Sequence, residues 1–149
     1  MPYEGLKEGK TLTQEKGIKS VRGNVTEGRW LSFSTHGHRL EHSNNSISLA
    51  SDKGDFSEKQ LFVVHWQGKV PKDNAYKIST SDKKPMYLTD SLKLSSKKDD
   101  GATFAIFDNG NGQGHSIQDT KSNKFVSVGK QNLTLASKPA TFKVVSVTL

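Results

Sequence analysis

Cysteine is absent from this chain of 149 residues, and apolar residues make up only 32% of it. Without cysteine there is neither a disulfide framework nor a thiolate metal site. No apolar run approaches the roughly 18 residues that a membrane-spanning helix needs. So few apolar residues indicate a single narrow core, filled by alternate residues of short strands whose other faces are polar.

The N-terminus lacks the features of a secretory signal. The first ten residues, MPYEGLKEGK, are followed by no apolar segment, so we expect no signal peptide within these residues. Asn24, Asn44 and Asn132 are each followed two positions later by Ser or Thr, which forms three N-glycosylation sequons. We expect a secreted, extracellular protein of which this chain is a mature piece.

One pattern occurs three times. ISLAS at 47–51, LKLSS at 92–96 and LTLAS at 133–137 each alternate apolar and polar residues and end in serine. The copies start 45 and 41 residues apart. Self-similarity at such a spacing indicates a repeat architecture.

Further segments recur around each copy in the same order. Downstream come FVV at 62–64, FAI at 104–106 and FKV at 142–144. Upstream come RWLS at 29–32, MYLT at 86–89 and KFVS at 124–127, and a fourth segment lies around Val21, Ile78 and Ile117. Alternation with a period of two predicts short strands with one buried face, separated by turns rich in Gly, Asn, Asp and Ser.

Three blocks of four strands, each of about 40 residues, resemble the β-trefoil, a six-stranded barrel capped by three hairpins with pseudo-threefold symmetry. We predict one all-β domain of this kind over 18–149, with 1–17 as an N-terminal extension or linker. A β-sandwich is the alternative, but it does not explain three equivalent blocks. The predicted inward side chains occupy the alternate apolar positions. They are Val21, Leu31, Ile47, Leu49, Phe62, Val64, Ile78, Leu88, Leu92, Leu94, Phe104, Ile106, Ile117, Val126, Leu133, Leu135, Phe142 and Val144.

The stretch DNGNGQGH at 108–115 has the composition of a ligand loop, but it lies between the second and third blocks. A calcium loop would place an oxygen ligand two residues after Asp108, where Gly110 stands. A phosphate loop would precede a helix and contain Lys and Ser or Thr. Asn-Gly is a strong turn signal, so we predict a turn that binds no metal ion.

The segment HGHRLEH offers His36, His38 and His42 beside Glu41. Two imidazoles and a third ligand are enough for zinc. The segment falls in the extra length between LSF and ISL of the first block, so we predict a solvated surface loop instead.

Enzyme chemistry has little support in the sequence. No serine lies in a Gly-x-Ser-x-Gly elbow, and paired carboxylates need a cleft that a filled small barrel does not provide by itself. We therefore predict a chain that is not an enzyme on its own and that carries no cofactor.

Two surface features suggest binding. Trp66 follows the FVV strand, where the other blocks have Asp108 and Ser146, and can stack on a sugar or fold over the barrel rim.

Lysines follow the repeated serine of each block and would surround one end of the barrel. They are Lys53, Lys97, Lys98 and Lys138. Such a rim would attract phosphate, anionic lipid or acidic polysaccharide, or it is simply a set of solvated turn lysines. Nucleic acid is not expected, because no aromatics interleave with these lysines.

The segments YEGLKEGKTLTQEKG, VRGNVTEGRWLSF, GNGQGHSIQDTKSNKFVSV and FKVVSVT resemble the C-terminal region of fungal secreted phosphoesterases, of the phospholipase C and acid phosphatase family. KFVSV and LTLAS also resemble fascin-type trefoil repeats, whereas the Gln-x-Trp signature of ricin-type sugar-binding trefoils is missing. The resemblance covers only the non-catalytic tail of that family. It therefore implies an upstream catalytic domain and assigns no catalytic residue here.

Three functions follow as hypotheses. The first is a non-catalytic, lectin-like module, a monomer, that targets a secreted phospholipase C-like enzyme to a glycan or an anionic lipid surface. The second is a free-standing trefoil lectin or a protein-interaction or inhibitor protein. The third is an enzyme in its own right.

Overall fold

The computed structural model describes residues 11–12 and 17–148 of the chain, and their regular structure is almost entirely strand. The first seven strands are β1 (Thr11–Leu12), β2 (Ile18–Ser20), β3 (Trp30–Thr35), β4 (His38–Ser43), β5 (Ser46–Ser51), β6 (Phe56–Ser57) and β7 (Phe62–Lys69). The others are β8 (Asn74–Thr80), β9 (Tyr87–Leu88), β10 (Leu94–Ser95), β11 (Phe104–Asp108), β12 (His115–Asp119), β13 (Phe125–Val128), β14 (Leu133–Ala136) and β15 (Lys143–Val147). The predicted all-β class is confirmed.

Helix is limited to two 3-10 turns in the described part of the chain, η1 (Glu58–Gln60) and η2 (Lys98–Asp100). Neither is long or apolar enough to reach across a bilayer. Gln60 closes η1 by a capping box with Ser57, which satisfies backbone donors at the start of the turn.

One antiparallel sheet contains most of the strands. Its main path runs β14-β13-β12-β11-β8-β7-β3-β15-β2, while β4, β5, β9 and β10 branch from it. In addition, His115 and Phe142 exchange two backbone hydrogen bonds of 2.8 Å, which link the start of β12 to the residue before β15. Outside this sheet, β1 pairs with β6, so Thr11–Leu12 of the N-terminal extension lies along the domain.

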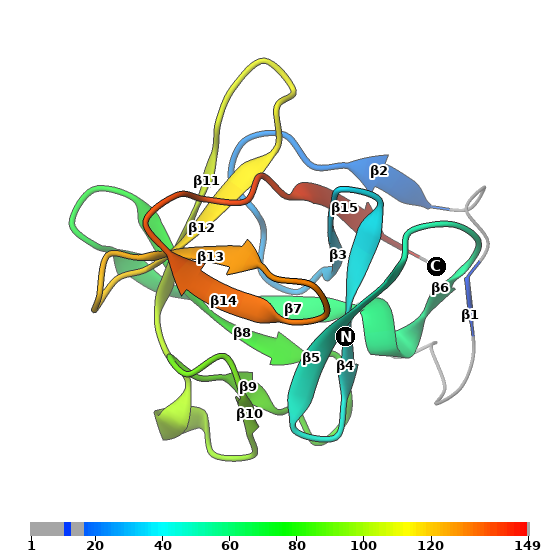
Figure 1. Ribbon diagram of the computed structural model, residues 1–149, viewed down its shortest axis with the longest axis horizontal. Helices are drawn as coiled ribbons and strands as arrows, with labels where there is room; N and C mark the ends of the chain where they lie inside the picture. The colour runs from blue at the N-terminus through cyan, green and yellow to red at the C-terminus, as the bar shows by residue number, and fades with distance from the viewer. Residues whose placement is uncertain (1–10, 13–16, 149) are drawn as a thin grey trace.

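Three hairpins, β4-β5, β9-β10 and β13-β14, lie around the middle of the molecule (Figure 1). They touch one another through their backbones: Ser48 of β5 bridges Asn132, and the amide of Leu94 in β10 donates to the carbonyl of Asn45 at 2.9 Å. The repeated ISL and LTL segments lie in the second strands β5 and β14, whereas of LKL only Leu94 belongs to the second strand β10.

The first block is organised differently from the sequence prediction. RWLS was matched with MYLT and KFVS, but β9 and β13 are first strands of hairpins and the corresponding strand of the first block is β4. HGHRLEH at 36–42 is therefore mostly a hairpin strand, and its prediction as a solvated loop is wrong. The physical reason is that Leu40, paired with Leu49, and His42 are both buried.

The main core is the one that the alternation predicts. All 18 predicted inward residues belong to it, with Val21, Leu49 and Leu135 only partly buried. Edge-on contacts between Phe33 and both Phe62 and Phe142 add directional packing, at ring centroid distances of 6.0 and 6.5 Å. Five core residues were not predicted: Val25, Phe33, Leu40, Tyr76 and Ala140.

A second apolar cluster contradicts the prediction of a single core. It contains Trp30, Phe56, Leu61, Val63, Val145 and Val147, with Ile18 packed against it. These residues alternate with the main-core residues along β3, β7 and β15, so the two faces of these strands are both apolar here. Arg39 of β4 covers Phe56, with its guanidinium carbon 3.8 Å from the ring centroid.

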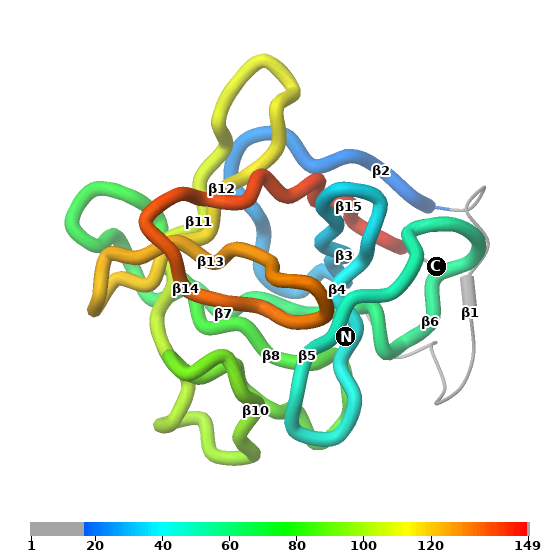
Figure 2. The backbone as a smooth tube through the Cα atoms, viewed as in Figure 1, coloured from blue at the N-terminus to red at the C-terminus, as the bar shows by residue number. Residues whose placement is uncertain are grey.

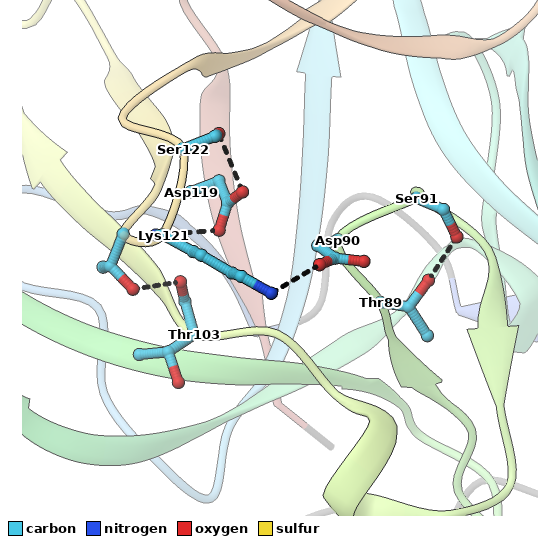
Figure 3. Close-up of polar contacts among 8 residues, drawn as sticks. Thr89, Asp90, Ser91, Thr103, Asp119, Lys121 and Ser122 are labelled. Carbon is cyan, nitrogen blue, oxygen red and sulfur yellow. Dashed lines mark hydrogen bonds and ion pairs between the residues drawn. The ribbon is translucent and has the colours of Figure 1, made fainter.

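Polar contacts secure the turn between β12 and β13. The Asp119 carboxylate is buried and accepts from the Ser122 hydroxyl at 2.8 Å and from the Lys121 amide at 3.2 Å. Figure 3 shows how Lys121 then reaches Asp90 of the neighbouring hairpin turn, 3.9 Å away. Both ends of this ion pair are solvent-exposed, so its contribution to stability is small, about 0–1 kcal/mol.

The segment 21–29, between β2 and β3, is tied to the ends of three other strands. Tyr76 Oη donates to the carbonyl of Val25 at 2.9 Å, and His115 Nε2 donates to the carbonyl of Gly23 at 2.6 Å. Asp108 Oδ2 accepts from the Gly23 amide at 2.5 Å. These contacts join residues 51 to 92 positions apart and hold the segment on which both candidate sites depend.

Candidate functional site

Trp66 is one of the two large apolar side chains exposed in the described part of the chain, with 53% of its surface accessible. It stands on β7 opposite Tyr76 of β8. The register of the two strands shifts between Trp66 and Gly68, which places Gln67 in a bulge beside the ring. Of the two alternatives left open by the sequence, the exposed platform is therefore the one found, and the rim lid is not.

The Trp66 indole is held in place by its neighbours. Its Nε1 donates to Asn74 Oδ1 at 3.1 Å, and its backbone amide donates to Glu27 Oε1 at 2.5 Å. A ring fixed before a ligand arrives loses less conformational entropy on binding. Glu27 and Gln67 contact the backbone of Trp66 and Asn74 contacts its indole nitrogen, so amide and carboxylate groups occur in the same region.

Asp108 occupies the position in β11 that Trp66 occupies in β7. Asp108 pairs with His115 as Trp66 pairs with Tyr76, so the correspondence expected from the repeat is confirmed by the register. Hydrogen bonds from the amides of Gly110 and Gly23, and the nearby charges of His115 and Arg22, hold the pKa of Asp108 below its ordinary value of 3.8. Asp108 is therefore ionised at neutral pH.

The 108–115 stretch is a turn, as predicted. The Asn109 amide donates to the Gly114 carbonyl and the Gln113 amide to that of Gly110. Asn111 and its glycine neighbours have positive φ, which glycine adopts without strain. Figure 2 shows the loop projecting from the body of the domain beside the segment that follows β2.

A cleft with a volume of about 320 Å³ lies beside this loop. It is bordered by the 34–37 turn after β3, Asp52 after β5, the end of β2, and residues of β15. Arg22, His36, Gln113 and Lys143 also line it. The sequence contained no signal for this cleft, because its walls come from five separate segments that only the tertiary structure brings together.

The four predicted lysines are exposed and follow the hairpins, outside the strands. Lys53, Lys97 and Lys138 each lie two residues after the end of β5, β10 or β14, and they are exposed, as is Lys98. The backbone carbonyl of Lys98 also accepts from Lys77 Nζ at 2.9 Å, which gives this lysine a local structural contact.

The histidines of the first block serve separate purposes. His36 lies in the turn after β3, and its carbonyl faces Nδ1 of His38 at 3.0 Å. His42 is buried against the Phe62 ring and donates from Nε2 to the carbonyl of Glu58 at 3.1 Å. Within residues 11–12 and 17–148, no three His, Asp or Glu side chains come together as a metal site would require.

A serine and a histidine do meet, at Ser79 and His65, whose Oγ and Nε2 are 2.8 Å apart. Nucleophilic catalysis would need the serine to reach a substrate. Ser79 is completely buried, and its hydroxyl donates to the carbonyl of Thr80 at 3.1 Å. His65 Nε2 therefore donates to Ser79, so this geometry is that of a structural hydrogen bond in a strand pair rather than of an activated nucleophile.

The chain was compared with protein-family models, curated proteins and solved structures, and none of them matches it.

Proposed function

We propose that the chain is a non-catalytic β-trefoil module that binds glycan through the exposed face of Trp66. The architecture is supported first by the hairpins, in which equivalent apolar residues face each other. These pairs are Leu40 with Leu49, Leu88 with Leu94, and Val126 with Leu135. Three hairpins with the same pair at the same position agree with a pseudo-threefold axis.

The long strands give further support for the trefoil. The last strand of each block pairs with the first strand of its own block and with that of the next: β7 with β3 and β8, and β11 with β8 and β12. For β15 the partners are β3 and, through the His115–Phe142 bridge, β12. A cyclic order of this kind favours a closed six-stranded barrel over a two-sheet β-sandwich.

The single observation that carries the glycan proposal is the exposed but fixed Trp66 ring. Sugars present an apolar face of C–H groups and an equatorial rim of hydroxyls, so an aromatic platform bordered by polar groups complements them. Gln67 and Glu27 hydrogen-bond the backbone of Trp66, so an amide and a carboxylate lie in this region, and we expect them to reach such hydroxyls. The Asn74 carbonyl oxygen is already used to orient the indole.

An anionic lipid surface is a weaker candidate for the partner. A flat membrane attracts basic residues only within about a Debye length, roughly 8–10 Å. The four lysines are exposed and lie outside the strands, and no described contact orders their ammonium groups, whereas the Trp66 indole is held by Asn74. The resemblance to the tail of secreted fungal phosphoesterases fits a module that directs an attached catalytic domain to a glycan surface.

The test is glycan-array binding of the whole chain, followed by titration of each hit with Trp66→Ala and Trp66→Phe. We expect Trp66→Ala to weaken binding by tenfold or more, about 1.4 kcal/mol, and Trp66→Phe to retain part of it. Binding should change little between 50 and 500 mM salt, roughly, because stacking is not screened as charge pairs are.

The matched control replaces Lys53, Lys97, Lys98 and Lys138 together by glutamine. This variant should bind the same glycans with nearly parental affinity. If it loses binding while Trp66→Ala keeps it, the lysines carry recognition and the glycan proposal is wrong. If no glycan binds and phosphatidylglycerol vesicles do, the partner is the anionic surface.

A further inference from the structure

The cleft beside the 108–115 turn is separate from the Trp66 platform, because neither Trp66 nor its polar neighbours line it. Its volume, about 320 Å³, lies at the lower end of small-molecule pockets, roughly 300–1,000 Å³. A ligand of a single ring or two would therefore fill it.

The charges around the cleft are balanced, although the chain as a whole carries a net charge of +7. Two cations, Arg22 and Lys143, face two carboxylates, Asp52 and Asp108. A site for phosphate or sulfate needs an excess of cations, and a site for a cation needs an excess of carboxylates. Balanced charge instead suits a neutral ligand that donates and accepts hydrogen bonds at several places.

The polar side chains of the cleft have hydrogen-bonding capacity to spare. Within the described structure, the guanidinium of Arg22, the ammonium of Lys143 and the side-chain amide of Gln113 make no hydrogen bond to another residue. The Asp52 carboxylate accepts none either, since the buried Arg39 behind it donates to Gly54, Asp55 and Gln60 instead.

Asp108 is held in a fixed position with capacity left over. Each of its carboxylate oxygens accepts one backbone amide, Oδ2 from Gly23 and Oδ1 from Gly110. A carboxylate oxygen has two lone pairs, so each can accept one more hydrogen bond. The Asp108 carboxylate is therefore an acceptor of fixed orientation. Arg22 and Lys143, which line the same cleft, provide donors on longer and more flexible side chains.

We propose that this cleft is a second binding site, and that its ligand is a neutral polyhydroxylated molecule of the size of a hexose. Vicinal hydroxyls of a sugar donate to the carboxylates of Asp108 and Asp52 and accept from Arg22, Lys143 and Gln113. No Phe, Tyr or Trp side chain borders the cleft, and His36 is the one ring among its lining residues. Recognition there rests on hydrogen bonds rather than on stacking, and binding is weak and selective for hydroxyl configuration.

This second site does not depend on the proposed function of Trp66. A module with both sites would contact a glycan at two points, and two weak contacts on one chain raise the apparent affinity without any new interaction. The segment 21–29 connects them, since it carries Arg22 at the cleft and Glu27 at the platform.

The experiment is an NMR titration of the isotope-labelled full chain with D-glucose, D-galactose and D-mannose at millimolar concentrations. D-glucuronate and inorganic phosphate serve as charged comparisons. We expect one of the neutral hexoses to shift the backbone amides of Gly110, Gly112 and Gly114 and of the 34–37 turn. The Trp66 indole signal reports separately on the platform, so either site can fail without the other.

Two glycines of the loop provide a matched pair of variants. A Cβ at Gly112 would collide with Nη1 of Arg22, whereas a Cβ at Gly110 meets nothing within 4 Å. Both positions have positive φ, 72° and 83°, so alanine causes comparable backbone strain at each. Gly112→Ala displaces Arg22 and should weaken hexose binding by about tenfold, while Gly110→Ala should leave it within about twofold.

A second pair tests the charge directly and guards against misfolding of the loop variants. Arg22→Gln should weaken hexose binding, and Arg29→Gln, an exposed arginine outside the cleft, should not. The proposal is overturned if phosphate or glucuronate produces the loop shifts and no neutral hexose does. It is equally overturned if no probe shifts these amides, or if Arg22→Gln binds like the parent.

Discussion

The hydroxyl of Tyr76 donates a hydrogen bond of 2.9 Å to the backbone carbonyl of Val25, which lies 51 residues earlier in the chain. Both residues are buried, and burial raises the pKa of Tyr76, with a further contribution from Glu27. The bond fixes the middle of the 21–29 segment, between Arg22 at the cleft and Glu27 at the Trp66 platform. One phenol therefore helps to position both candidate sites.

Tyr76→Phe should lower the free energy of unfolding by about 1–2 kcal/mol, because the buried Val25 carbonyl loses its donor while the ring packing stays. Urea unfolding measures the change, and amide hydrogen exchange should be faster at 21–29 than elsewhere. Tyr87→Phe is the control, since no described residue hydrogen-bonds the Tyr87 hydroxyl. Equal losses in both variants would show that the Tyr76–Val25 bond has no particular role.

Asp108 should act as a structural cap and not as an ion ligand. Calcium or zinc added to the protein should leave its melting temperature unchanged, because a ligand that binds only the folded state must raise it. Asp108→Ala should lower the melting temperature through the lost bonds to Gly23 and Gly110. A metal-dependent rise that Asp108→Ala abolishes would contradict the absence of a metal site.

His42 should make the fold less stable in mild acid. Burial holds the pKa of His42 below its ordinary value of 6.5, although Asp82 and the carbonyl of Glu58 act in the opposite direction. The unfolded chain therefore binds the proton first as the pH falls. The contribution of neutral His42 to the free energy of unfolding is fully present above pH 6.5. It is lost as the pH falls from 6.5 towards the lower pKa that His42 has in the folded state.

Melting temperatures between pH 8 and pH 5 test this expectation. His42→Gln keeps a donor for the Glu58 carbonyl and should show a shallower fall below pH 6.5 than the parent. His36→Gln, at an exposed turn, should follow the parent curve. The pKa of His65 is also lowered, by burial and by Lys98. Protonation of His65 should therefore account for part of the fall in melting temperature that His42→Gln still shows below pH 6.5.

The resemblance of the three blocks was readable from the sequence because it depends on local alternation. Ile47, Leu92 and Leu133 begin a repeated pattern of period two, and such a pattern specifies which face of a strand is buried wherever the strand is placed. The same holds for the turn at 108–115, whose asparagines and glycines favour positive φ regardless of tertiary contacts. All the predicted inward residues were therefore found in the main core.

Local alternation failed where both faces of a strand are covered. In β3, Leu31 and Phe33 face the main core while Trp30 lies in the second cluster. The alternation in RWLSF therefore resembles that of the hairpin strands β9 and β13, although β3 is not a first strand of a hairpin. His38–Ser43 was misassigned as a loop for the same reason, because Arg39 is buried among the carbonyls of Gly54 and Asp55 instead of being solvated.

The sequence alone determined the all-β class, the turn at 108–115 and the main core of this protein, since these follow from side-chain period and turn chemistry over a few residues. Only the tertiary structure decided that Trp66 is exposed and held by Asn74, and that Arg22, Asp52 and Asp108 surround one cleft. The cleft brings Arg22 together with Asp108, 86 positions later in the chain (108 − 22). These arrangements depend on how the strands come together in space, which no local pattern records.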